Sequence, residues 1–209
     1  MLSTSPPVRV GIVGCGSFGR NAYGRNLHQC PDAEVVALCD ADRGRAEALL
    51  QELSGGGGSK GPSVYAGYED MLRKESLDAV MIATMADVRP RVAVAALEAG
   101  AHVLAAKPMA PSLAAAEHML RVADQAGRLL VVGYNFRFRE GAQAVRRFIV
   151  EGGLGKPLFA RAWSHEASVP VWGPHYVKSV SGGGSLASTA VHVIDLAIWF
   201  LGCPRLISA

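Results

Sequence analysis

Long apolar runs, a strong excess of one charge and the pattern of a signal peptide are all absent from this sequence of 209 residues. Its 21 basic and 18 acidic residues are dispersed, and no stretch is apolar over the length of a membrane span. Residues 1–7 lack the basic and apolar regions of a signal peptide. We therefore expect a globular protein of the cytoplasm that contacts neither a membrane nor nucleic acid.

Cysteine and histidine are few and scattered. The four cysteines, Cys15, Cys30, Cys39 and Cys203, show no metal-ligand spacing, and most lie in segments typical of buried strands or helices. The six histidines form no cluster. The sequence therefore predicts no metal site, and it favours free thiols in the core over disulfides.

The most informative feature that is present is a glycine-rich turn. A short apolar run at residues 8–13 leads into Gly14-Cys15-Gly16-Ser17-Phe18-Gly19, and a helical pattern follows. A G-x-G-x-x-G string alone is weak evidence, and an ordinary glycine-rich loop is the alternative. A strand before the string and a helix after it favour a dinucleotide-binding turn.

Each glycine of this string has its own expected role. Gly14 permits the tight turn, and Gly16 lets the backbone approach a pyrophosphate without a Cβ atom in the way. Gly19 lets the helix pack closely on the strand. We expect the pyrophosphate at the N-terminus of the helix, where Ser17 and Phe18 begin it.

An acidic residue ends the next apolar run. Asp40 lies 21 residues after Gly19, where a carboxylate can accept hydrogen bonds from both ribose hydroxyls of the adenosine half. This position favours NAD as the cofactor. NADP stays an alternative because Arg43 could compensate for its extra phosphate, although Asp40 and Asp42 would repel that group.

Strand and helix signals alternate over the first two thirds of the chain. They predict strands at 8–14, 34–40, near Val64, 78–84, 102–105 and 129–132, and helices up to Gln29 and over 42–53, 92–99 and 113–126. This βαβ period predicts an α/β domain over residues 1–133 with a parallel sheet. The glycine-rich residues 54–62 read as a flexible surface loop within it.

The pattern changes after residue 133. We predict a helix at 142–151, a strand at 157–164 and a helix at 185–201, after which eight residues remain. A single strand cannot build an independent sheet. Either residues 134–209 lean on the first domain, or the chain is a fragment of something longer.

Two residues are candidates for proton transfer. Lys107 follows the strand at 102–105, at the end where ligands bind in open α/β sheets, although it could equally be a solvated loop cation. His192 shares a helix face with Ser188 and Asp195 and could deprotonate a carbinol as its hydride leaves for a nicotinamide. A core histidine that is hydrogen-bonded by one of these neighbours is the alternative.

The chain resembles the Gfo/Idh/MocA family of glucose-fructose oxidoreductases, inositol dehydrogenases and rhizopine catabolism proteins in four blocks. They are GIVGCGSFG, AVMIATMADVRPRVAVAALEAGAHVLAAKPMA, GYNFRFREGAQAVRRFIVEGGLGKPLFAR and GGGSLASTAVHVIDLAIWFLG. The resemblance implies an N-terminal Rossmann domain that binds NAD(P), and a second α/β domain with a mostly antiparallel sheet that often forms a homo-oligomer. Residues 134–209 would be the beginning of that second domain, since family members are usually much longer.

The resemblance also assigns site residues. Lys107 matches the lysine of a Glu-Lys-Pro motif and His192 matches the catalytic histidine, but Ala106 replaces the family's glutamate and Ser188 its catalytic aspartate. The loss of these carboxylates predicts weaker or altered catalysis at His192. Thr84 is the residue kept from a Thr-Pro-Asn motif that contacts the cofactor.

Together these features predict an NAD(P)-dependent oxidoreductase that acts on a polyol, sugar or related hydroxyl or carbonyl substrate. Lys107, His192 and Ser188 would act on the substrate, and the glycine turn would hold the cofactor with Asp40. The alternative is a catalytically impaired or truncated dinucleotide-binding module with a sensing or binding role.

Overall fold

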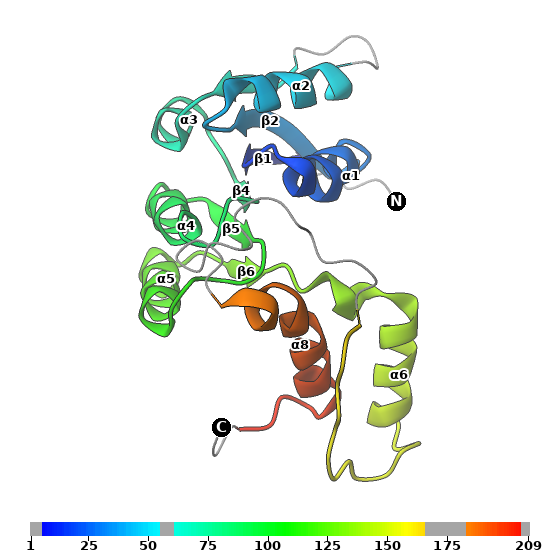
Figure 1. Ribbon diagram of the computed structural model, residues 1–209. Coiled ribbons are helices and arrows are strands. Elements are labelled where there is room, and N and C mark those ends of the chain that lie inside the picture. The colour runs from blue at the N-terminus through cyan, green and yellow to red at the C-terminus, as the bar shows by residue number, and fades with distance from the viewer. Residues whose placement is uncertain (1–5, 55–60, 166–182, 206–209) are drawn as a thin grey trace. The chain divides into compact units, whose positions relative to one another are not determined.

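The computed structural model describes residues 6–54, 61–165 and 183–205. The chain divides into two compact units, Met1–Val132 and Gly133–Ala209 (Figure 1).

The first unit is built on one parallel sheet. Its strand order is β3-β2-β1-β4-β5-β6, and every pair of neighbours is parallel. The strands are β1 (Val8–Val13), β2 (Ala33–Cys39), β3 (Ser63–Tyr65), β4 (Ala79–Ile82), β5 (His102–Ala105) and β6 (Leu130–Val132). The order changes direction between β1 and β4, which is where open α/β sheets bind ligands. This confirms the predicted α/β fold and parallel sheet.

Helices cover both faces of this sheet. They are α1 (Arg25–His28), α2 (Arg43–Leu53), α3 (Tyr68–Lys74), α4 (Arg89–Glu98) and α5 (Leu113–Ala126). Helices α1 and α2 pack on one face, and α3, α4 and α5 cover the other (Figure 1). The caps follow the sequence, because the Asp42 carboxylate accepts from the Gly44 N–H at the start of α2, and Gly127 ends α5 in a left-handed conformation.

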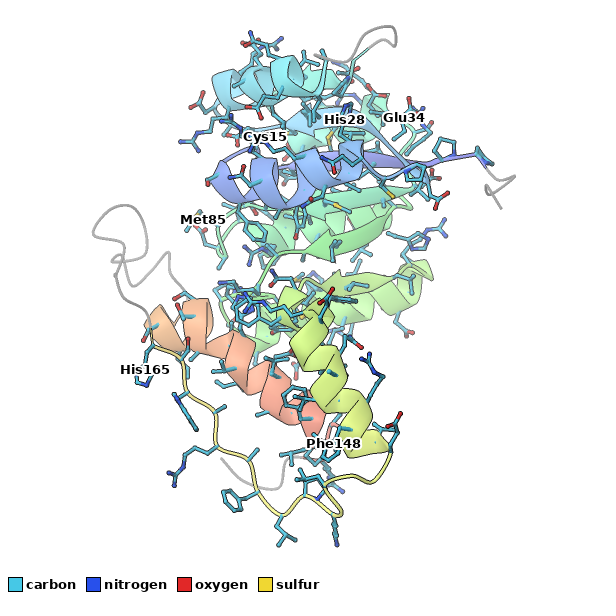
Figure 2. All side chains as sticks on the ribbon, turned by 90° about the vertical axis from the view of Figure 1, so that its right-hand side faces the viewer. Cys15, His28, Glu34, Met85, Phe148 and His165 are labelled. Carbon is cyan, nitrogen blue, oxygen red and sulfur yellow. The ribbon has the colours of Figure 1, made fainter. Side chains whose placement is uncertain are left out.

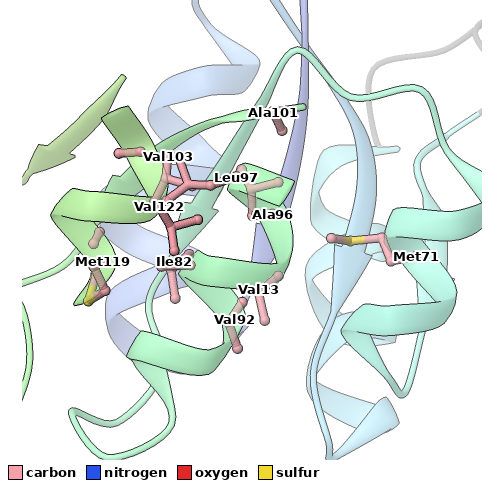
Figure 3. Close-up of a cluster of buried hydrophobic side chains, with 14 of the residues drawn as sticks. Val13, Met71, Ile82, Val92, Ala96, Leu97, Ala101, Val103, Met119 and Val122 are labelled. Atoms are coloured by element: carbon pink, nitrogen blue, oxygen red, sulfur yellow. The ribbon is translucent and has the colours of Figure 1, made fainter. Parts of the chain in front are cut away.

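Each face of the sheet has its own apolar core. Ile82, Leu97 and Met119 are among the buried side chains between the sheet and helices α3 to α5 (Figure 3). Leu38 and Leu49 are fully buried on the opposite face, against α1 and α2. Burial on both faces explains why the strands read as continuous apolar runs.

The first unit differs from the sequence prediction in two places, and one further prediction falls on residues that the structure does not describe. The helix after the glycine turn begins as a π-helical turn, Gly19–Gly24, before α1 continues it. Helix α3 was not predicted, because its seven residues are too few to show a clear period. The predicted loop at 54–62 falls mostly on residues 55–60, which lie outside the described ranges.

The second unit is helical in the part that the structure describes. A 3-10 turn at Asn135–Phe138 leads into α6 (Glu140–Val150), and a π-helical turn at Leu186–Ala190 leads into α8 (Val191–Phe200). Helices α6 and α8 pack against each other. The predicted helix at 185–201 is therefore present, but its first turn is π-helical rather than α-helical.

The predicted strand at 157–164 is wrong. These residues have no regular structure, and Leu158 and Phe159 are 86% and 81% exposed. An isolated strand leaves its backbone N–H and C=O groups unpaired, and no described residue of the second unit lies in a strand that could pair with it. The antiparallel sheet that the family resemblance implies stays a prediction.

We expect Leu49→Ala to lower the free energy of unfolding by about 2–5 kcal/mol, because Leu49 is fully buried in the core between α2 and the sheet. The matched control is Leu120→Ala on α5, where the side chain is exposed and the change should stay within about 0.5 kcal/mol. Urea unfolding followed by circular dichroism measures both. Equal losses in the two variants would contradict the assigned core.

Candidate functional site

The candidate groups of the first unit gather at the carboxyl edge of its sheet. Cys15 follows β1 and Met85 follows β4, and both side chains lie at this edge (Figure 2). Glu34, at the start of β2, lies at the opposite edge (Figure 2). Parallel pairing of β1 with β2 and β4 brings the three strand ends together.

The glycine turn is packed so tightly that two of its glycines cannot be replaced without displacing backbone. Gly14 has a φ of +96°, and a Cβ atom there would lie 2.7 Å from the carbonyl carbon of Ala83. A Cβ atom on Gly19 would overlap the carbonyl oxygen of Gly14. Gly19 therefore lets the helix start directly against the strand end.

Gly16 has a different environment. A Cβ atom built there meets nothing within 4 Å, so the space above the turn is open. A pyrophosphate in this space would lie against bare backbone, beside the start of the helix. The turn therefore fits a dinucleotide.

The Asp40 carboxylate holds the glycine turn from the end of β2. Its Oδ2 accepts a hydrogen bond from the backbone N–H of Cys15 at 2.8 Å, and its Oδ1 accepts one from the N–H of Asp42 at 2.9 Å. An ionised carboxylate has about four acceptor positions, so capacity for ribose hydroxyls is left. Asp40 therefore fixes the turn and can still bind a ribose.

A cavity of about 270 Å³ lies beside this turn. Its lining residues are Cys15, Gly16, Ser17, Arg20, Asn21, Arg45 and Ala48. The sequence prediction named Arg43 rather than Arg45 as the cation near the turn. Arg43 is exposed and pairs with Glu47 at 2.8 Å, one turn along α2, so Arg45 is the nearer cation of this helix to the turn. The sequence signal for Arg45 was its position near the start of the helix that follows Asp40, two residues after Arg43.

Ser17 and Phe18 lie at the start of the helix, as predicted. The hydroxyl of Ser17 accepts a long hydrogen bond from the Asn21 side-chain amide at 3.4 Å. Phe18 is partly exposed and meets the buried ring of Tyr23 edge-to-face, with ring centroids 5.5 Å apart. Burial raises the pKa of Tyr23 to about 12, so this ring stays neutral.

Lys107 lies just beyond the end of β5. The sheet ladder continues to Ala106, whose N–H donates to the carbonyl of Ile82 at 2.8 Å. The following peptide bond, between Lys107 and Pro108, is cis. Ala106 is only 5% exposed, so the position that the resemblance matches to a glutamate is apolar and buried here.

Arg89 was also missed. It is the first residue of α4, is 4% exposed, and donates through its two terminal nitrogens to the carbonyls of Thr84 and Pro108. Thr84 follows β4, and its own hydroxyl donates to the Met85 carbonyl at 3.3 Å. The sequence signal for Arg89 was only its place between a strand end and Pro90.

The second unit places His192 against an aromatic ring. Its imidazole stacks on Phe136 with centroids 4.2 Å apart and an interplanar angle of 14°. The guanidinium of Arg139 lies 3.5 Å from the centroid of the same Phe136 ring. Stacking on Phe136 thus fixes the plane of the imidazole, and the Arg139 cation lies over the same ring.

Asp195 is held by an arginine. Arg137 donates from Nε to one carboxylate oxygen at 2.7 Å and from Nη2 to the other at 2.5 Å, and Asp195 is 8% exposed. This hydrogen-bonded pair raises the pKa of Arg137. The prediction that Ser188 and His192 share a helix face depends on regular α-helical spacing. Ser188 lies instead in the π-helical turn, where the backbone hydrogen bonds run over five residues, so that spacing does not apply to this pair.

No group of three or more histidine, cysteine or acidic side chains that could hold a metal ion occurs in the described ranges. No helix there is long and apolar enough to cross a membrane.

Two family models match the chain. The model of the oxidoreductase family with an NAD-binding Rossmann fold matches residues 8–134, and the model of the GFO/IDH/MocA C-terminal domain matches residues 142–209. The chain belongs to the Gfo/Idh/MocA family. The glycine turn and Asp40 lie in the Rossmann match, and His192 lies in the C-terminal match.

Curated relatives align with almost all of this chain. It is 30% identical over 202 residues to D-glucoside 3-dehydrogenase of Escherichia coli, a match of 96% of this chain and 56% of that protein. It is 31% identical over 204 residues to inositol 2-dehydrogenase of Leifsonia xyli, 97% and 56% of the two chains. The chain thus spans about half the length of the curated relatives it matches.

Solved structures of the family share this fold. Scyllo-inositol dehydrogenase from Lactobacillus casei, solved with NAD(H) and scyllo-inositol, matches with a TM-score of 0.81 and 25% identity, over 94% of this chain and 56% of that one. Myo-inositol 2-dehydrogenase from Lactobacillus plantarum matches with a TM-score of 0.79 and 24% identity, over 94% and 57%.

We expect Gly16→Ala to weaken NADH binding about tenfold or more, a loss of about 1.4 kcal/mol, while the melting temperature stays that of the wild type. The added methyl group meets open space in the protein and would occupy the position of the pyrophosphate. Titration of NADH fluorescence and thermal unfolding measure the two effects. Gly19→Ala is the contrasting variant, which should be destabilised by about 1–3 kcal/mol because its Cβ overlaps backbone. Unchanged NADH affinity in Gly16→Ala would contradict the assignment of this turn.

We also expect Cys30 and Cys203 to react with Ellman's reagent in the native protein at pH 8, and Cys15 and Cys39 only after denaturation. Burial, together with the Asp40 charge, raises the pKa of both Cys15 and Cys39 to about 12. At pH 8 only about one in ten thousand of such thiols is the reactive thiolate. Cys30 and Cys203 are exposed. Rapid labelling of Cys15 would show that the glycine turn is more open than described.

Proposed function

We propose that the protein oxidises a secondary hydroxyl of a sugar or cyclitol to a ketone with NAD as the hydride acceptor, and catalyses the reverse reduction. Membership of a family with an NAD-binding Rossmann fold supports the cofactor. The names of the relatives, D-glucoside 3-dehydrogenase and inositol 2-dehydrogenase, support the substrate class.

One observation carries this proposal. The glycine turn after β1 and Lys107 after β5 lie at the same carboxyl edge of one parallel sheet. A dinucleotide whose pyrophosphate lies against Gly16 and whose ribose binds Asp40 would direct its nicotinamide half across this edge, toward the ends of β4 and β5. Bound there, the nicotinamide supplies an acceptor for a hydride ion.

The residues of the chain would bind and orient the substrate and move its proton. The Lys107 ammonium would donate a hydrogen bond to the reacting oxygen. His192 would accept the proton of this hydroxyl group while a hydride leaves the carbon that bears it. The carbon thereby loses two electrons and becomes a carbonyl carbon. Ser188 would hydrogen-bond the substrate without contributing a charge. Phe136 would keep the imidazole in one plane through the observed stacking.

NAD is favoured over NADP in this proposal. The Asp40 carboxylate would accept hydrogen bonds from the ribose hydroxyls and would repel a phosphate added there. Arg45 lines the cavity beside Gly16, but its Nε lies 3.3 Å from an oxygen of Asp42, so its charge is already partly neutralised. Arg43 is similarly paired with Glu47.

A second candidate function is a dinucleotide-binding module without catalysis. Two replacements favour it, because Ala106 is apolar and buried where the family has a glutamate, and Ser188 has no charge where the family has an aspartate. Residues 1–133 would be the cofactor domain in either case, and residues 134–209 would belong to a substrate and assembly domain. A homo-oligomer and a cytoplasmic location stay predictions.

The test is a binding and turnover assay on the purified chain. NADH and NADPH are titrated first, and NAD reduction is then followed with myo-inositol and with a glucoside. NADH binding with substrate-dependent reduction supports the dehydrogenase. NADH binding with no reduction of NAD by either compound supports the binding module. Folded protein that binds neither cofactor would contradict both functions.

We expect Lys107→Ala to lower the turnover number by about 10²- to 10⁴-fold, the range typical of a lost group that transfers or polarises a proton. NADH affinity should stay within about twofold, because the glycine turn is unchanged. Lys74→Ala is the matched control, since Lys74 is exposed on α3 and pairs with Asp70. Equal turnover in Lys107→Ala and the wild type would remove Lys107 from the mechanism.

A further inference from the structure

We propose that Arg89 is a positioning residue that holds Lys107 in place by joining the loops that follow β4 and β5. This role rests on the proposed function, in which Lys107 binds the reacting oxygen. The observation behind it is a buried guanidinium that donates to Thr84 on one loop and to Pro108 on the other.

The sheet stops holding the two loops together just before Lys107. Strands β4 and β5 are paired up to Ile82 and Ala105, and the last ladder bond runs from the Ala106 N–H to the Ile82 carbonyl. Pro108 has no N–H group, so it cannot donate a further bond to the neighbouring loop.

Arg89 supplies the missing link. One terminal nitrogen donates to the Pro108 carbonyl, directly after Lys107, and the other donates to the Thr84 carbonyl, two residues after β4 ends. Lys107 is therefore fixed on both sides, by the ladder bond of Ala106 before it and by the guanidinium bond to Pro108 after it. A side chain in such a position has fewer conformations to search during reaction.

The buried charge of Arg89 indicates a specific role for its two hydrogen bonds, since an apolar side chain would fill the same space at lower cost. Its hydrogen-bond partners in the described part of the chain are two backbone carbonyls. Burial lowers its pKa to about 10, and the Tyr23 hydroxyl and the Asp87 carboxylate partly offset this effect without a hydrogen bond to it. A buried cation whose hydrogen bonds go to neutral carbonyls is costly. The planar guanidinium offers five N–H donors in a fixed fork, which lets it reach two separate carbonyls at once; an ammonium group lacks this geometry.

The first test compares steady-state kinetics of Arg89→Lys and Arg89→Met with the wild type. Displacement of a catalytic group by about 1 Å can cost about 100-fold, so we expect the turnover number to fall by about 10- to 100-fold in Arg89→Met. NADH affinity should fall by much less than the turnover number, because the glycine turn is not touched and only the position of Thr84 at the cofactor edge is altered. Arg89→Lys, which can restore one of the two bonds, should recover part of the loss.

Arg91→Met is the matched control. Arg91 lies on the same helix, two residues further on, and is exposed. It should leave both the turnover number and NADH affinity at the wild-type values. An equal loss in Arg91→Met and Arg89→Met would overturn the proposal, since it would reflect a change of charge on α4 rather than the two bonds.

A double-mutant cycle separates positioning from general destabilisation. If Arg89 acts through Lys107, Arg89→Met should have no further effect on turnover once Lys107 is alanine. Fully additive losses in the double variant would overturn the proposal. Melting temperatures of all variants identify any that fail to fold, and Arg89→Lys then serves in place of Arg89→Met.

The reactivity of Lys107 can be measured without turnover, so it tests the role of Arg89 independently of the proposed function. The rate at which Lys107 is acylated by a lysine-selective reagent, relative to Lys74 in the same molecule, is measured by mass spectrometry. We expect this ratio to change at least about threefold in Arg89→Met and to stay constant in Arg91→Met. A constant ratio in Arg89→Met would contradict the role of Arg89, whereas a changed ratio in a protein without turnover would contradict only the dehydrogenase.

Discussion

Parallel pairing of β1 with β2 and of β4 with β1 and β5 is the constraint on which the candidate site depends. It places the ends of these strands at one edge of the sheet, although the residues that follow them are far apart in sequence. Asp40 then fixes the glycine turn to the end of β2, and Arg89 fixes Thr84 to the loop of Lys107. A shift of register between β1 and β4 would separate the glycine turn and Asp40 from Thr84, Arg89 and Lys107.

The second unit uses a different kind of interaction to hold its candidate residue. A bidentate pair between Arg137 and the buried Asp195 joins the 3-10 turn to α8, over 58 residues of sequence. Burying the carboxylate without this partner would cost several kcal/mol, so the pair is needed where it stands. The same 3-10 turn carries Phe136, which stacks on His192. The position of the imidazole therefore depends on two contacts that come from one short turn.

Much of the first unit could be predicted from sequence because its signals are local. Strand periods and the glycine spacing need only neighbouring residues, and both are confirmed. Arg89 could not be predicted, because its role depends on a carbonyl 19 residues away. The wrong strand at 157–164 has a related cause, since an apolar run becomes a strand only when another strand pairs with it. The roles of His192 and Ser188 stay predictions, carried by the family resemblance.

The most direct test of the account is to locate NADH on the protein by amide chemical shifts in an isotope-labelled sample. We predict that the largest changes fall on the turn from Gly14 to Gly19, on Asp40 and on the residues that follow β4. These groups share an edge only because of the parallel pairing. Changes centred on the opposite edge, near Glu34 at the start of β2, would contradict the central claim that the carboxyl edge of this sheet binds the cofactor.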